Sequence, residues 1–239
     1  MRKSVFFLLA LPLMAIAQDK NVISYDRVFP KPGKTQQFEK ALAAHVQKYH
    51  KGDNSWRVYT IESGPDVGGY NIIEGPTTWD GVDKRGNLGA AHTADYDTNI
   101  LPLLTDKSMT GYATYRADLS TEQIANYTGK IAVTHIFPKP GYADEMDDMF
   151  GKLKKTWEAS GQTAAVYELS SSGEPQYVVV ISYKEGLKER ATGYRKPMKE
   201  RYNGANGDGS WATYQQGLRT MIDHSWSELL FYKPELGSK

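Results

Sequence analysis

One short stretch of the chain occurs twice. RVFPKPG spans residues 27–33 and HIFPKPG spans residues 135–141, so the shared FPKPG recurs after 108 residues. The same shift places Phe38, Leu42 and Tyr49 on Met146, Phe150 and Trp157. YRADL at 115 matches YKPEL at 232 with a shift of 117, and the glycine-rich NGANGDGS at 203–210 accounts for the added residues. A repeat of this length indicates two structurally similar halves.

Each half carries signals for the same order of elements. NVISYDRVF predicts a strand, which the prolines and glycine of PKPG end. Residues 35–50 place apolar residues three and four apart and predict a helix. WRVYTIES and GYNIIEG predict a hairpin. A second helical region follows, which Thr77, Thr78 and Asp80 could cap and which ends at ILPLL. The last strand is predicted at MTGYATYRADL. The order is strand, helix, strand, strand, helix, strand, which predicts an α+β fold of two tandem ferredoxin-like repeats.

The first 17 residues differ from the rest of the chain. MRKSVFFLLALPLMAIA combines a basic start, an apolar run and small residues at its end, as secretory signals do. The run is too short to span a bilayer comfortably. We therefore predict a signal peptide at 1–17, a ferredoxin-like repeat at 18–119, a linker at 120–129 and a second repeat at 130–239. The protein is expected to be exported, periplasmic or secreted, with no membrane attachment after cleavage.

Composition excludes several classes of function. Lys and Arg number 29 against 28 Asp and Glu, so no basic excess points to nucleic acid. The chain has no cysteine, which excludes disulfides and cysteine-based zinc or iron–sulfur sites.

The strand, the KPG turn and the helix beginning KTQQFEKAL or YADEMDDMF resemble the dimeric α+β barrel superfamily, near the antibiotic-biosynthesis monooxygenases and NIPSNAP-like proteins. The resemblance implies that the two repeats face each other sheet to sheet and form an α+β barrel within one chain. It also implies a small ligand between sheet and helices. Activities known in that superfamily include cofactor-free oxygenation of aromatic compounds, haem degradation, and haem-dependent chlorite or peroxide chemistry.

Several polar and aromatic residues are candidates for binding a ligand. Arg27 and His135 occupy equivalent places, on the strand face that alternation gives to apolar residues. Either they orient a ligand or they reach solvent at the strand end. Tyr59 and Tyr167 are likewise equivalent, and an aromatic ligand or an ordinary core explains both.

The remaining candidates lie in the first half. Glu74 and Trp79 flank an expected cleft entrance, with a plain surface position as the alternative reading of Glu74. His92 lies near the start of the later helical segment. His45 aligns with Leu153 in the apolar stripe of the first helix, so it is either a core histidine with a hydrogen-bond partner or a residue facing a wetter cleft.

No metal and no cofactor are expected from the sequence. His45 and His50 are five residues apart, a spacing that does not place both on one helix face, and no HExxH motif or EF-hand loop occurs. The prediction is an exported protein that binds a small apolar or aromatic molecule, with a cofactor-independent monooxygenase-like enzyme as one form of it. The alternatives are a non-catalytic envelope interaction protein and a haem-binding enzyme like chlorite dismutase or peroxidase. Catalysis and further oligomerisation stay open.

Overall fold

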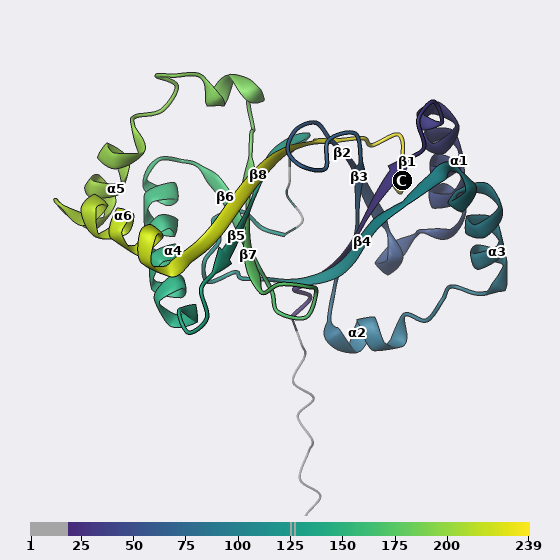
Figure 1. The fold of residues 1–239 in the computed structure, drawn as a ribbon, viewed down its shortest axis with the longest axis horizontal. Coiled ribbons are helices and arrows are strands. Elements are labelled where there is room, and N and C mark those ends of the chain that lie inside the picture. Colours follow the sequence, from purple (N-terminus) through teal and green to yellow (C-terminus); the bar gives the residue numbers. More distant parts are fainter. Residues whose placement is uncertain (1–18, 125, 127) are drawn as a thin grey trace, which may run out of the picture.

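The computed structural model describes residues 19–124, 126 and 128–239, so the expected signal peptide lies outside the described residues. The first half contains four strands, three α-helices and two short 3-10 helices (Figure 1). In chain order these are β1 Val22–Pro30, α1 Thr35–Tyr49, η1 Gly52–Asn54, β2 Trp56–Ile61, β3 Tyr70–Thr77, α2 Trp79–Lys84, α3 Ala90–Asn99, η2 Leu101–Leu103 and β4 Leu104–Tyr115.

The second half repeats this order. Its elements are β5 Lys130–Pro138, α4 Ala143–Ala159, β6 Thr163–Leu169, β7 Gln176–Ser182, η3 Leu187–Arg190, α5 Met198–Asn206, α6 Ser210–Met221 and β8 Ile222–Tyr232. The predicted α+β fold of two tandem βαββαβ units is confirmed. Thr78 caps α2 as predicted, since its side chain accepts a hydrogen bond from the Gly81 N–H.

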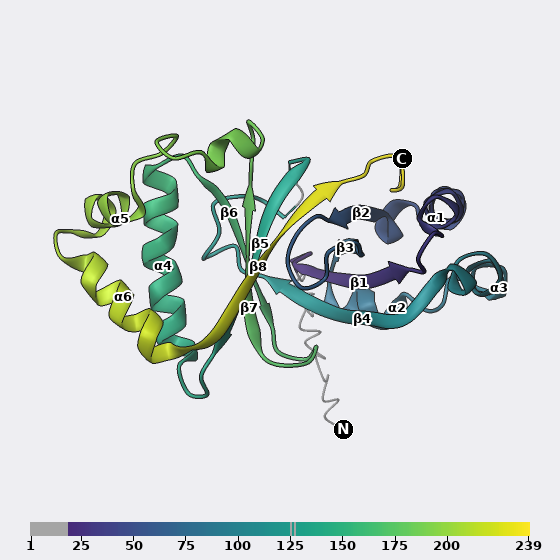
Figure 2. The same cartoon turned by 45° about the horizontal axis from the view of Figure 1, so that its top comes forward.

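The eight strands form one closed antiparallel barrel in the order β1-β3-β2-β8-β5-β7-β6-β4. Each half supplies four adjacent strands, and the halves join where β2 pairs with β8 and β4 with β6. Helices α1 to α3 lie outside the barrel at one end and α4 to α6 at the other (Figure 2). Closure leaves no unpaired sheet edge between the halves.

Apolar residues are buried in three places. The barrel interior holds one cluster, which includes Ile23, Val133 and Leu230. A second cluster lies under α1 and includes Phe38 and Leu42, and a third lies under α4. Each helix therefore buries the apolar stripe that its sequence predicts, against the outer face of its own sheet.

One predicted boundary is wrong. The sequence analysis assigned ILPLL to the second helical region, but β4 already begins at Leu104. Pro102 has no N–H to extend a helix, and Leu104 is buried in the first-half core. The strand therefore begins five residues earlier than the motif MTGYATYRADL suggests.

The segment after β8 crosses back to the first half. Leu236 joins the core under α1. The Ser238 hydroxyl donates to the His50 carbonyl at 2.6 Å, and the Ser238 N–H donates to the Trp56 carbonyl at 2.9 Å. The chain end thus fixes the backbone of His50. Among the described residues no helix is long and apolar enough to cross a membrane.

Candidate metal centre

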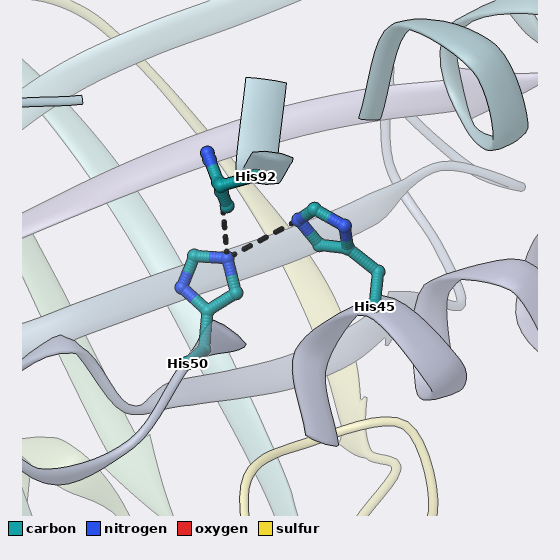
Figure 3. A group of neighbouring side chains, drawn as sticks. All are labelled: His45, His50 and His92. Carbon is teal, nitrogen blue, oxygen red and sulfur yellow. Dashed lines mark hydrogen bonds between the residues drawn. The ribbon is translucent and has the colours of Figure 1, made fainter. Parts of the chain in front are cut away.

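Three histidines of the first half converge between the helices and the sheet (Figure 3). His45 lies in α1 and is 1% exposed, His50 follows the last residue of α1 and is fully buried, and His92 lies in the first turn of α3. The Nε2 atom of His50 is 3.4 Å from that of His45 and 3.3 Å from that of His92. One atom from each ring lies within 4.8 Å of the other two.

The expectation that His45 and His50 point in different directions is wrong. It assumed that the helix includes both residues, but α1 ends at Tyr49. His50 has extended backbone angles, φ −102° and ψ 93°, which turn its side chain back under the helix. A spacing of five therefore brings the two rings together.

The other nitrogens of His45 and His50 already have acceptors. His45 Nδ1 lies 2.7 Å from a carboxylate oxygen of Asp95, and His50 Nδ1 lies 3.2 Å from the Asn54 carbonyl oxygen. These oxygens can only accept, so each Nδ1 carries the proton of a neutral ring. In these tautomers the two Nε2 atoms face each other with lone pairs and no proton between them. A bound cation would relieve this contact.

Two of the three nitrogen separations match those of a tetrahedral metal site. Zinc binds imidazole nitrogen at about 2.0–2.1 Å, which separates two tetrahedral nitrogen ligands by roughly 3.3–3.4 Å. The two Nε2 separations at His50 have these values. Metal-bound histidines also commonly donate their second N–H to a carboxylate or carbonyl, as His45 and His50 do.

The surroundings keep the three rings neutral and in place. Burial lowers the pKa of His45, of His50 and of His92 below the ordinary value, which favours the unprotonated form that binds metal. The Trp56 ring stacks on His50 with centroids 3.5 Å apart. The His92 Nδ1 is buried, and no atom of the described residues forms a hydrogen bond of ordinary geometry with it.

Glu74 is a buried carboxylate behind His50, so its reading as a surface residue is wrong; it is 9% exposed. It lies inside β3, which continues to Thr77, and its Oε2 is 3.7 Å from His50 Nδ1. Trp56 Nε1 donates to it at 2.6 Å, and Arg85 forms an ion pair with it. Burial opposes its ionisation, but hydrogen bonds from Arg85, His50 and Trp56 prevail and lower its pKa to about 2.

A polar cleft adjoins this site. It occupies about 410 Å³ between the outer face of the first sheet and α2, and Asn54, Glu74 and Arg85 line it. Trp79, the predicted flank of a cleft entrance, is 44% exposed at the start of α2 and contacts Tyr112, which lines the cleft.

The other predicted residues lie inside the barrel. Arg27 Nη2 is 3.4 Å from His135 Nε2, and both residues line an apolar cavity of which about 60 Å³ is open to water-sized solutes. Neither reaches solvent, because Arg27 is 4% and His135 8% exposed. Arg27 forms ion pairs with Glu228 and Asp66, so its charge is already balanced.

Tyr59 and Tyr167 also face the barrel interior, and both are 2% exposed. Burial raises the pKa of Tyr59 to about 12 and that of Tyr167 above its usual range. The Tyr167 hydroxyl has no hydrogen-bond partner among the residues that the structure describes. The eight candidates thus form two groups: His45, Glu74 and His92 at the histidine cluster, with Trp79 nearby, and the remaining four in the barrel.

Comparisons with known proteins bear on the fold. No protein-family profile matches the chain, and no curated protein matches it in sequence. Among solved structures, an anthrone oxidase-like protein superposes with a TM-score of 0.58 at 13% identity, covering 90% of this chain and 92% of the other. A mutant chlorite dismutase from Candidatus Nitrospira defluvii gives 0.55 at 8% identity, covering 92% and 94%. The chain has the dimeric α+β barrel fold, as its sequence suggested.

The described histidines do not form a haem site. A histidine that ligates haem iron has to face an open pocket that can hold the macrocycle. The ring centroids of His45, His50 and His92 lie 4.8–5.3 Å apart, so these rings contact one another. In the second half His135 is in the barrel, and His224 is stacked on Phe137. The histidine cluster fits a single ion rather than a macrocycle.

Proposed function

We propose that this is an exported metal-binding protein, in which His45, His50 and His92 hold one divalent transition-metal ion of the zinc class. The observation that carries the proposal is the facing Nε2 atoms of His45 and His50, whose Nδ1 atoms already have acceptors. Export is proposed from the sequence of the first 17 residues.

The donor set narrows the class of metal. Three neutral imidazoles suit zinc, copper, iron and nickel, whereas calcium and magnesium prefer oxygen ligands. The residue group that can bind the ion contains three histidines and, among the described residues, no fourth ligand. Three protein ligands are typical of zinc sites that leave one position for water or a ligand.

This arrangement supports metal-assisted binding of a small molecule. A metal with an open position can polarise a carbonyl group or lower the pKa of bound water. The polar cleft shares Glu74 with the surroundings of His50 and suits a polar ligand. The apolar or aromatic ligand expected from the sequence stays a prediction; the cavity that fits its chemistry is the one in the barrel.

The first test is the metal itself. The protein purified from its exported form is analysed for metals, stripped with a chelator and titrated with Zn²⁺ and Co²⁺. We expect one ion per chain with micromolar or tighter affinity, and a cobalt absorption spectrum typical of tetrahedral coordination. The sequence indicates no metal, and failure to bind either ion at one site would support that expectation and overturn the proposal.

A further inference from the structure

The second half has a strongly basic hollow on its outer surface, far in sequence from the histidine cluster. It lies between η3 and α5 and has a volume of about 660 Å³. Arg190, Arg195, Lys196 and Arg201 line it together with one acid, Glu189. Three of these cations also line the neighbouring hollow beside Ser160.

The guanidinium group of Arg201 is hydrogen-bonded only to uncharged groups among the described residues. Its Nη1 donates to the Ser160 hydroxyl at 3.1 Å and to the Gln162 side-chain oxygen at 2.8 Å, and its Nε donates to the Lys196 carbonyl. Among the described residues no carboxylate lies within ion-pair distance of it. Burial and the nearby Arg195 charge lower the pKa of Arg201. A partly buried cation beside another cation is unfavourable unless an anion joins them.

The other side chains leave a net positive charge. Arg195 is paired with Glu189, yet its buried Nε has no hydrogen-bond partner in the part of the chain that the structure describes. Lys196 is paired with Glu200. Arg190 donates to the Tyr183 hydroxyl at 2.9 Å, and no carboxylate of the described residues forms an ion pair with it.

Four cations against two acids, Glu189 and Glu200, leave an excess of two positive charges. The whole chain has a formal net charge of only +1. The excess is therefore local to this hollow.

We propose that this hollow binds a small oxyanion carrying two negative charges, held chiefly by Arg201 and Arg190. Guanidinium groups present planar sets of N–H donors that match the oxygens of phosphate, sulfate or carboxylate. The site is separate from the histidine cluster and stands whether or not a metal binds there.

Calorimetric titration of the chelator-treated protein with inorganic phosphate, sulfate and succinate tests the site at constant ionic strength, with chloride as the reference anion. We expect saturable binding of at least one dianion, and the tightest of the three identifies the oxyanion type. Arg201→Gln should weaken that binding about tenfold or more, the loss of a charge-assisted contact.

Lys199→Gln is the matched control, because Lys199 is an exposed cation of the same helix and does not line the hollow. We expect the affinity of Lys199→Gln for the dianion to stay within about twofold of that of the native protein. If Arg201→Gln does not fold, the exposed Arg190→Gln replaces it, with a loss of threefold or more. Absence of saturable dianion binding, or an equal loss in Lys199→Gln, would overturn the proposal.

Discussion

The first helix of each half carries a different residue at the same place, His45 in α1 and Leu153 in α4. Leu153 packs in an apolar cluster with Met149, Phe150 and Trp157. The chain beyond the two helices differs as well. Position 158, which aligns with His50, is an exposed glutamate inside the longer α4, whereas α1 has already ended and His50 turns inward.

This difference indicates that the two halves of the duplicated fold have different roles, one in stability and one in the candidate site. Both halves supply four strands to one barrel, so both contribute to its stability. Among the described residues, the histidine cluster lies under the helices of the first half, and burying its polar groups has a desolvation cost that leucine and phenylalanine avoid. The second half can support the barrel while the first carries the site.

The strongest test of this comparison exchanges the two residues. His45→Leu should weaken Zn²⁺ binding at least about 1,000-fold, or about 4 kcal/mol, because one of three ligands is lost. Leu153→His should gain no site, since no partner histidine surrounds it in the described residues. Competition titration with a chelator measures both. Native affinity in His45→Leu would show that this histidine has only a structural role.

A second test compares the equivalent barrel residues. Arg27→Leu should lower the free energy of unfolding by roughly 3 kcal/mol, because it leaves the buried Glu228 carboxylate uncompensated. His135→Phe keeps the stacking on Trp226 and should cost about 1 kcal/mol in lost hydrogen bonds. Urea unfolding measures both values. Equal costs would mean that charge pairing does not distinguish the two positions.

Substitution of Asp95 tests whether the hydrogen bond to His45 matters for zinc binding. Asp95→Asn should weaken zinc binding about 10–100-fold, because the carboxylate that orients His45 is lost. Asp97→Asn on the same helix removes an equal charge at an exposed position and should leave the affinity nearly unchanged. If both variants bind alike, orientation of His45 by Asp95 is not important.

The smallest expected effect is on the pH dependence of the metal-free protein. Burial lowers the pKa of His45 and of His50 below the ordinary 6.5, so the unfolded chain takes up these protons first as the pH falls. Stability is complete above about pH 6.5 and decreases below it, by at most about 0.8 kcal/mol per histidine at pH 6. Urea unfolding at pH 7.5 and 6 should show a smaller loss in His45→Leu. A rise in stability on acidification would reverse the assigned direction.

The fold could be predicted from the sequence because the repeat and the strand and helix patterns are local signals. FPKPG marks the same strand exit twice, and alternation placed Ile23, Tyr25 and Arg27 on the face that lines the barrel cavity. Contacts between distant segments were not predictable in this way. No sequence pattern indicates that β2 pairs with β8 across the two halves.

The sequence indicates some residues of the candidate site but predicts no metal there. It makes His45, Glu74 and His92 candidates for binding a ligand, whereas it gives no reason to choose His50 or Asp95. The decisive feature is one residue long: α1 ends at Tyr49, and the extended backbone of His50 turns its ring inward. Helix ends are difficult to place to within one residue from sequence, and here that residue decides whether the histidines converge.

Because residues 236–238 contact the first half, some contacts at the histidine cluster form only after most of the chain has been synthesised. Ser238 holds the backbone of His50 and Trp56, so these contacts form only when almost two hundred further residues have been synthesised. A nascent chain that already contains all three histidines still lacks the hydrogen bonds from Ser238. In the proposed metal centre, uptake of the ion at full affinity would therefore follow completion of the barrel and would be coupled to a late step of folding.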